Sequence, residues 1–255
     1  MASEPRLYLI GRPSLEQSGL TAFLTDRTMQ LAESPDATPA EHVVEICGRL
    51  CYMSFSKDTS KIRHPNAKYI ENLIEQAHDS VLEHANWTFI LDHVSRAFSH
   101  QLVRHRVGFA FSQLSQQYHE EHDAEFVEPP GLTQEAQAEW KTSLEGARSA
   151  YTRLLAFYST TSDPTMNQKE TLRLARSAAR SVLPNATKTA IAVTANARAL
   201  RHFLKVRGTI TGDIEMRLVA AEIYRMLSQE APALVAGIEL QSREDGWPII
   251  ATTPN

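Results

Sequence analysis

Hydrophobic and polar residues along this 255-residue chain follow two periods, one typical of helices and one typical of strands. Apolar spacing and capping signals predict helices over 14–24, 38–53, 66–77, 133–158, 165–180, 196–206 and 213–229. Alternation or β-branched runs predict strands over 6–10, 86–92, 187–194 and, with a bend, 108–118. This order predicts an α+β fold, a small mostly antiparallel sheet with surrounding helices.

The expected helix ends carry recognisable signals. Thr38 followed three residues later by Glu41 is a capping-box sequence, and Ser14 is a candidate cap for the first helix. Gly208 is expected to close a helix in the left-handed conformation, and Asp163-Pro164 to separate two helices. After residue 229 the chain holds a short apolar segment, Ile238 to Leu240, and is expected to end loosely in the last four residues, 252–255.

Composition limits the class of protein. Hydrophobic residues make up 42% of the chain and charged residues 22%, which is ordinary for a globular protein, and we expect one domain over residues 1–255. The net charge of −4 argues against nucleic-acid or membrane partners. Because the sequence has no apolar run of about 18 residues and no signal peptide, we expect a cytoplasmic protein.

The only two cysteines, Cys47 and Cys51, stand four residues apart on a predicted helix. An i,i+4 pair on a helix is a poor disulfide, and two thiols alone cannot form a zinc site. Neither thiol lies beside a visible base, so a nucleophilic role lacks support. We therefore expect buried, reduced thiols.

Two histidine pairs raise the alternative of a metal site. His78 and His84 flank a glutamate but lie six residues apart, which does not place them on one helix face, and no third ligand is evident. His119 and His122 lie in a charged segment that is not a His-Glu-x-x-His motif. We predict no metal, and expect pocket, capping or solvated roles.

A basic cluster, Arg104-His105-Arg106, follows the apolar run 94–103 and precedes a segment rich in Ser and Gln, 111–118. Burying unpaired charge costs several kcal/mol, so the cluster needs an anion or water. One interpretation is a solvated basic patch at a helix end, and the other is a nucleotide-phosphate site, because arginine binds phosphate in a bidentate manner. The sequence has no P-loop or Rossmann glycine motif, so neither device would hold such a nucleotide.

The same segment resembles the signature of the flavin-dependent thymidylate synthases, in which Arg-His-Arg is followed after seven residues by Ser and often by Arg two residues later. Further matches in order are His78-x-Ser80-x-x-Glu83-His84, Arg180 before Leu-Pro184, and Asn196, Arg198, His202 and Arg207 on one predicted helix. The resemblance extends over roughly residues 40 to 235. Several separated matches are more specific than the triplet alone.

The resemblance implies a flavoprotein methyltransferase of nucleotide biosynthesis that makes dTMP from dUMP. It implies FAD as the hydride carrier, methylenetetrahydrofolate as the carbon donor and NADPH as the reductant. It also implies the family's α+β fold in a homotetramer, with active sites at subunit interfaces. The cofactor would carry the difficult chemistry, and the protein would align flavin, pyrimidine and folate.

Carried over residue by residue, the resemblance assigns two groups of side chains and one catalytic residue. Arg207 would lie against the uracil and stabilise negative charge that develops on its ring. The cofactor-binding residues would be His78, Ser80, Arg104, His105, Arg106, Gln113, Asn196, Ala197, Arg198 and His202. The substrate-binding residues would be Gln101, Arg104, Gln113, Ser115, Gln116, Gln117, Arg180 and Arg207.

Three positions depart from the family pattern. Eight residues rather than seven separate Arg106 from Ser115, which predicts a bulge near Gly108. Gln117 stands where the family often has Arg, and Thr211 where relatives often have His. The alternatives are therefore a divergent member acting on another pyrimidine nucleotide, a flavin- or nucleotide-binding protein without synthase activity, and a nucleic-acid-binding module.

Overall fold

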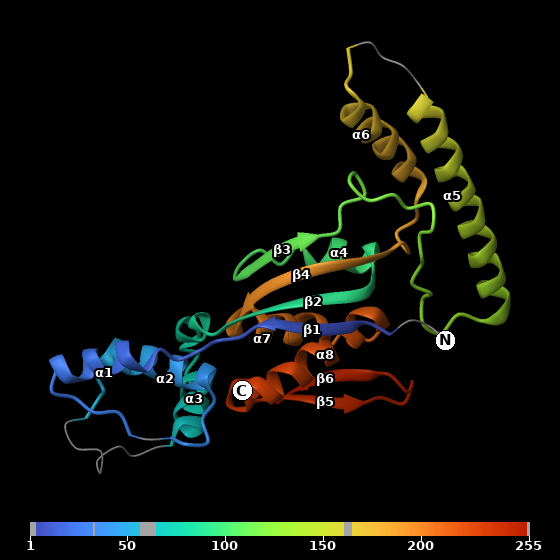
Figure 1. Cartoon of the computed structure of the whole chain (residues 1–255). Coiled ribbons are helices and arrows are strands. Elements are labelled where there is room, and N and C mark those ends of the chain that lie inside the picture. The colour runs from blue at the N-terminus through green and yellow to red at the C-terminus, as the bar shows by residue number, and fades with distance from the viewer. Residues whose placement is uncertain (1–3, 33, 57–64, 161–164, 254–255) are drawn as a thin grey trace. The chain divides into compact units, whose positions relative to one another are not determined.

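The computed structural model describes residues 4–32, 34–56, 65–160 and 165–253 (Figure 1). The helices of these residues are α1 (Gln17–Asp26), α2 (Pro39–Tyr52), α3 (Asn66–Glu75), α4 (Arg96–Leu102), α5 (Gln134–Thr160), α6 (Gln168–Ala179), α7 (Ala197–Arg207) and α8 (Ile214–Glu230). The strands are β1 (Arg6–Gly11), β2 (Asn86–Ser95), β3 (Phe109–Gln113), β4 (Lys188–Asn196), β5 (Ile238–Ser242) and β6 (Pro248–Thr252). The predicted α+β class is confirmed.

Backbone contacts divide the chain into two compact units. Unit 1 comprises Met1–Arg6, Leu91–Arg104 and Ser112–Ala192, and unit 2 comprises Leu7–Ile90, His105–Phe111 and Val193–Asn255. One sheet has the strand order β1-β2-β4-β3, and a second sheet is the pair β5-β6. The unit boundaries fall within the strands of the larger sheet.

In unit 1, α5 and α6 lie side by side as a helical hairpin (Figure 1). Leu144 and Tyr151 are buried on α5, and Ala175 and Ala179 on α6. The small side chains of Ala175 and Ala179 allow the α6 backbone to lie close to α5. Most other side chains of both helices are partly or fully exposed. The hairpin is therefore held by a narrow buried stripe.

In unit 2, the core joins the first half of β2 to α7 and α8. Trp87 and Phe89 are fully buried on β2, and Leu200, Phe203 and Leu204 are fully buried on α7 at helical spacing. Burying each such side chain stabilises the fold by about 1.5–3 kcal/mol. Since these residues precede Arg207 on the same helix, the core fixes the helix that carries the predicted catalytic side chain.

The capping prediction is confirmed for α2 and wrong for α1. Thr38 and Glu41 form the reciprocal capping box, with the Thr38 backbone N–H donating to Glu41 Oε2 at 2.8 Å. Helix α1 begins at Gln17 instead, and its cap is Glu16, whose Oε1 accepts from the Ser18 N–H at 3.1 Å. A carboxylate nearer the first turn takes the place expected for Ser14.

The prediction of a left-handed Gly208 is also wrong. Its φ is −69°, an ordinary right-handed value. A Cβ built there would lie 2.8 Å from the Leu204 carbonyl oxygen and would also collide with Ile250. Glycine is needed at this position because β6 approaches the end of α7 closely, and not because of its backbone angle.

The C-terminal segment, for which the sequence predicts no paired strands, forms an antiparallel hairpin, and the loose end expected from residue 252 is wrong for Thr252, the last residue of β6. Strands β5 and β6 pair with Leu240 opposite Ile250, and Gly246, with a φ of +81°, forms the turn. The polar residues between the strands and the proline at 248 obscure the alternation, which explains the missed prediction.

Three smaller predictions have different outcomes. Both cysteines are free, but only Cys47 is half-buried, so the expectation of two buried thiols is wrong for the exposed Cys51. The break predicted at Asp163-Pro164 lies outside the described residues. Among the residues that the structure describes, none of the helices is long and apolar enough to cross a membrane.

Candidate active site

The predicted site residues are distributed over both units. Unit 1 contains Gln101, Arg104, Gln113, Ser115, Gln116, Gln117 and Arg180. Unit 2 contains His78, Ser80, His105, Arg106, Asn196, Ala197, Arg198, His202 and Arg207. Most residues predicted to bind substrate thus lie in unit 1, and most predicted to bind the cofactor lie in unit 2.

The start of α7 organises the predicted cofactor residues of unit 2. Asn196 ends β4 and caps α7, because its Oδ1 accepts from the Ala199 N–H at 2.9 Å. Its own N–H donates to the Gly108 carbonyl at 3.2 Å. Gly108 has a φ of +74°, and a Cβ there would lie 2.7 Å from the Asn196 amide nitrogen. The turn after Arg106 is therefore seated on the α7 N-terminus.

This turn also corrects the predicted bulge. Gly108 lies in a turn directly before β3 and not within the strand ladder. A glycine in this conformation absorbs an extra residue without displacing paired strand residues. The additional residue between Arg106 and Ser115 is thus compatible with the regular strand Phe109–Gln113.

The predicted catalytic Arg207 lies against His105 within unit 2. The Arg207 Nε–H donates to His105 Nε2 at 3.0 Å, so the imidazole accepts at that nitrogen and is neutral. The pKa of His105 is lowered chiefly by burial, and further by the charge of Arg207 and by His202. The Phe203 ring packs edge-on against His105 at 5.4 Å. Arg207 and His105 are 102 residues apart in the sequence, but the fold brings them into direct hydrogen-bond contact.

A pocket of about 280 Å³ collects other predicted cofactor residues of unit 2. Its lining includes His78, Ser80 and Arg198, together with Tyr52. The Tyr52 and His78 rings stack 5.9 Å apart at 26°. A planar aromatic ligand fits such a wall, because it can extend the stack while the Ser80 hydroxyl and the Arg198 guanidinium supply donors.

Gln113 is held by hydrogen bonds inside unit 1. Its Nε2 donates to Ser99 Oγ at 2.8 Å and to Thr189 Oγ1 at 3.3 Å. The next residue joins β4 through a bond from the Leu114 N–H to the Ala190 carbonyl at 3.0 Å. These contacts fix the point at which the Ser115–Gln117 loop leaves β3.

The loop at Ser115 presents donors that fit an anion. Gln116 is buried, and its side-chain nitrogen has no hydrogen-bond partner among the described residues. Arg96 donates to the Leu114 carbonyl at 2.9 Å. The pKa of Arg96 is lowered mainly by burial, and Arg180 adds to the lowering while Glu121 opposes it. A buried amide donor without a partner, in a loop whose preceding Leu114 carbonyl is bound by an arginine, suits a phosphate.

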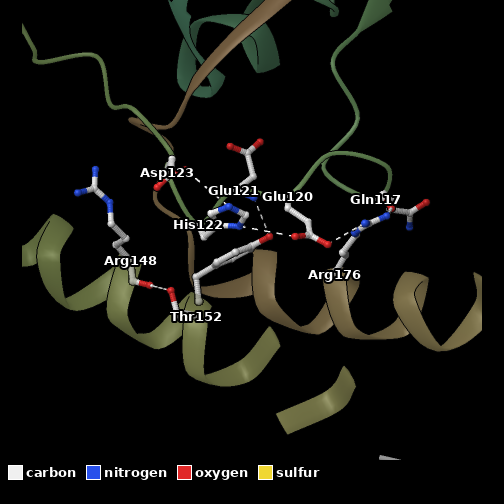
Figure 2. Close-up of polar contacts among 9 residues, drawn as sticks. Gln117, Glu120, Glu121, His122, Asp123, Arg148, Thr152 and Arg176 are labelled. Carbon is white, nitrogen blue, oxygen red and sulfur yellow. Dashed lines mark hydrogen bonds and ion pairs between the residues drawn. The ribbon is translucent and has the colours of Figure 1, made fainter. Parts of the chain in front are cut away.

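Figure 2 shows how the segment after this loop is attached to the α5–α6 hairpin. The Glu121 N–H donates to the buried Tyr151 hydroxyl at 2.9 Å, and Arg148 Nη2 donates to the Ala124 carbonyl at 2.7 Å. Burial is the main cause of the raised pKa of Tyr151. Both bonds run from a side chain of α5 to loop backbone, so α5 fixes the path of this loop.

Gln117, which departs from the family pattern, is tied to α6. Its Nε2 donates to Ser177 Oγ at 3.2 Å, and its carbonyl accepts from Arg176 Nη1 at 3.4 Å (Figure 2). Arg176 Nη2 also pairs with Glu120 Oε1 at 2.8 Å, and this bond lowers the pKa of Glu120. A guanidinium is therefore present next to Gln117, but it already has a carboxylate partner.

Sequence reasoning missed Arg96 and Arg176 as members of this environment. Arg176 and Arg180 stand four residues apart on one helix face, and this spacing is the signal that could have identified Arg176. Arg96 carries no local signal, because its role depends on the fold around Leu114. In contrast, the Arg104 and Arg106 residues are exposed to solvent.

The histidine pairs do not gain further ligands. Among the described residues there is no group of three or more His, Cys, Asp or Glu side chains placed to hold a metal ion. His122 is half-exposed and lies 3.6 Å from Glu120 and from Asp123 (Figure 2). This arrangement is a solvated charge cluster.

Comparisons with known proteins identify the family. The family model described as "Thymidylate synthase complementing protein" matches residues 35–233. The flavin-dependent thymidylate synthase of Mycobacterium avium (strain 104) is 41% identical over 236 residues, which cover 92% of this chain and 92% of that protein. The protein of the same name from Mycobacterium sp. (strain JLS) is 43% identical over 225 residues, covering 86% and 87%. This chain therefore belongs to the thymidylate synthase complementing protein family, whose members include its flavin-dependent relatives.

Proposed function

We propose that the protein is a flavin-dependent thymidylate synthase, which converts dUMP to dTMP by reductive methylation. Methylenetetrahydrofolate supplies the carbon, NADPH is the reductant and FAD is the hydride carrier. The observation that carries this proposal is the hydrogen bond from Arg207, the last residue of α7, to His105 of the Arg104-His105-Arg106 cluster, with both residues inside the range that the family model matches. The relatives bearing the flavin-dependent name match this chain over about nine-tenths of its length.

Arg207 is the proposed catalytic residue. One of its five N–H donors is used by His105, so the others remain able to face the uracil ring. A fixed guanidinium stabilises negative charge developing on the ring more effectively than water, because its dipoles need no reorganisation. The neutral His105 accepts the Arg207 Nε–H and so holds the guanidinium plane in one orientation.

The unit 2 residues fit part of a flavin. His78, Ser80 and Arg198 would hold FAD together with Arg104, His105, Arg106, Gln113, Asn196, Ala197 and His202. The stacked Tyr52 and His78 rings offer an apolar wall for a planar ring system. When bound, the flavin supplies the hydride, while these side chains orient it and exclude water.

The unit 1 residues fit the nucleotide. Ser115, Gln116 and Arg180 would bind the dUMP phosphate, with Gln101, Arg104, Gln113, Gln117 and Arg207 contacting the rest of the molecule. Support comes from the unused buried nitrogen of Gln116, since a buried donor without a partner is costly. Phosphate oxygens would satisfy it.

We further propose a single synthase domain over residues 1–255 that assembles into a cytoplasmic homotetramer, with active sites at the subunit interfaces. Val107 is strongly exposed, and Leu174 on α6 is exposed as well. These two side chains are candidate contacts with further copies of the chain. The 280 Å³ pocket is small for a whole FAD, which also supports a site completed by another protomer.

A divergent substrate is the second candidate. Gln117 lacks the charge that the family often has at that position, and Thr211 replaces a frequent histidine. These two positions favour a member that acts on another pyrimidine nucleotide over a flavin-binding protein without synthase activity, because Arg207 and His105 are still paired.

The test is an absorption spectrum of the purified protein followed by a product assay with FAD, NADPH, methylenetetrahydrofolate and dUMP. We expect a flavin spectrum and formation of dTMP. A flavin spectrum without dTMP, but with methylation of another pyrimidine nucleotide, would favour the second candidate. A colourless protein that forms no dTMP would contradict the proposed function.

A further inference from the structure

The turn that follows Arg207 is held by a buried arginine of α8. Arg217 is fully buried, and its Nη1 donates to the Thr211 carbonyl in this turn at 3.0 Å. The same guanidinium forms a bidentate pair with Asp245, with distances of 2.7 and 3.0 Å. It also donates to the carbonyls of Pro248 at 2.8 Å and Trp247 at 2.9 Å. One side chain thus joins the turn to the β5–β6 hairpin.

The hairpin makes a second connection to the end of α7. The Ile250 N–H of β6 donates to the Gly208 carbonyl at 3.0 Å. The absence of a side chain at Gly208 permits this approach, since a Cβ would collide with Ile250 and the Leu204 carbonyl. The residue immediately after Arg207 is therefore fixed by backbone contact with β6.

These contacts matter because Arg207 is the last residue of α7. The final carbonyls of a helix lack intrahelical partners, and helix ends fray unless other groups satisfy them. The Gly208 carbonyl receives Ile250, and the Thr211 carbonyl receives Arg217. The direction of the Arg207 side chain thus depends on segments up to 43 residues later in the chain, as far as Ile250.

We propose that the β5–β6 hairpin and Arg217 form a clasp that positions Arg207 for catalysis, with Arg217, Asp245 and Gly208 as positioning residues. This inference rests on the proposed function for the catalytic role of Arg207. The hairpin lies beyond residue 233, where the family match ends. Asp245 is partly exposed while Arg217 is buried, so the pair can be loosened from the solvent side without opening the core.

The experiment uses the full-length protein carrying Asp245→Asn, with Thr38→Ala as the control. Asp245→Asn removes the charge from the clasp but keeps the side-chain size. Thr38→Ala removes the cap of α2 and so lowers stability without touching Arg207, His105 or the turn that follows Arg207. Asp245→Glu tests whether a carboxylate restores the function.

The first readout is the titration of His105 by NMR of histidine-labelled protein without dUMP. In the wild type, burial, Arg207 and His202 lower the pKa of His105. If the clasp positions Arg207, the Asp245→Asn protein shows a His105 pKa closer to the ordinary value, whereas Thr38→Ala leaves it unchanged.

The second readout is dTMP formation by the flavin-loaded protein. We expect kcat of Asp245→Asn to fall about ten- to a hundredfold, with a smaller change in KM, because small displacements of a catalytic group carry losses of this order. Asp245→Glu should recover part of kcat, and Thr38→Ala should retain it. An unchanged His105 titration or an unchanged kcat in Asp245→Asn would overturn the proposal, as would an equal loss in Thr38→Ala.

Failure of the proposed function gives a different result. In that case the wild type forms no dTMP, yet the His105 titration still reports where the Arg207 guanidinium lies. A shifted pKa of His105 in Asp245→Asn then supports the clasp as a positioning device, and an unshifted pKa overturns it.

Discussion

The loop at Ser115 in unit 1 and the end of α7 in unit 2 hold candidate site residues by different means. The loop is attached by side chains of α5 and α6 that bind its backbone, as Tyr151 binds the Glu121 N–H. The end of α7 is built on a capped, buried helix, and its turn is fixed by Arg217 and β6. The comparison indicates that unit 1 leaves donors such as the Gln116 amide available, whereas unit 2 uses its donors to orient Arg207.

The largest effect is expected from Gly108→Val in unit 2. A β-branched residue disfavours the φ of +74°, and its Cβ would lie 2.7 Å from the Asn196 amide and 2.8 Å from Ala199 Cβ. We expect a loss of about 3 kcal/mol or more in the free energy of unfolding. Denaturant unfolding measures it, and Gly146→Val, where nothing lies within 4 Å, controls for valine itself. Equal losses of unfolding free energy in Gly108→Val and Gly146→Val would contradict the packing of the Gly108 turn against the start of α7.

A smaller effect is expected from Tyr151→Phe in unit 1. The change keeps the buried ring but leaves the Glu121 N–H without its acceptor. An unsatisfied buried donor costs about 1–3 kcal/mol, and thermal unfolding measures the loss. Tyr158→Phe on the same helix is the control. If the loop were held independently of α5, Tyr151→Phe would match this control.

Gln117→Arg tests whether the Ser115–Gln117 loop of unit 1 binds the substrate phosphate. It adds the charge common in the family and removes the bond to Ser177. A charge-assisted bond to phosphate is worth about 1.5–3 kcal/mol, so we expect a lower KM for dUMP, offset partly by the loss of the Ser177 contact. Ser177→Ala alone isolates that second contribution. A higher KM in Gln117→Arg would indicate that the tie to α6 matters more than the added charge.

The smallest effect is expected in the pH dependence of the free energy of unfolding, through the Arg217–Asp245 pair of the clasp. Arg217 is the main cause that lowers the pKa of Asp245 from 3.8 to about 2, and the Trp247 N–H adds to it. A lowered folded-state pKa means that this contribution to stability is present above about pH 3.8 and is lost as the pH falls toward 2. Unfolding measured across this range should show a shallower pH dependence in Asp245→Asn than in the wild type. Identical slopes would show that Asp245 does not contribute.

The features that could be predicted from the sequence are those that depend on residues close together in the chain. The Thr38 capping box, the Asn196 cap and the helices around them follow from local spacing. The family resemblance identified Arg207 and His105, although only the fold brings them within 3.0 Å.

Apart from the cap of α1, which is Glu16 instead of Ser14, the contacts that the sequence did not predict depend on distant partners. The Arg217–Asp245 pair spans 28 residues, and the β6 approach to Gly208 spans more than 40. Arg96 acquires its role only when Leu114 is placed beside it. Periodicity and capping rules describe local structure, so they carry no information on such pairings.

The most direct test of the central claim is the activity and flavin content of Arg207→Ala beside Arg225→Ala. Arg225 lies on α8, is exposed and forms an ion pair with Glu222 on the same helix. Loss of a preorganised charge-stabilising donor lowers kcat about 10²–10³-fold. We predict such a loss of dTMP formation in Arg207→Ala with the flavin spectrum retained, and near-normal activity in Arg225→Ala. Wild-type activity in Arg207→Ala would contradict the account.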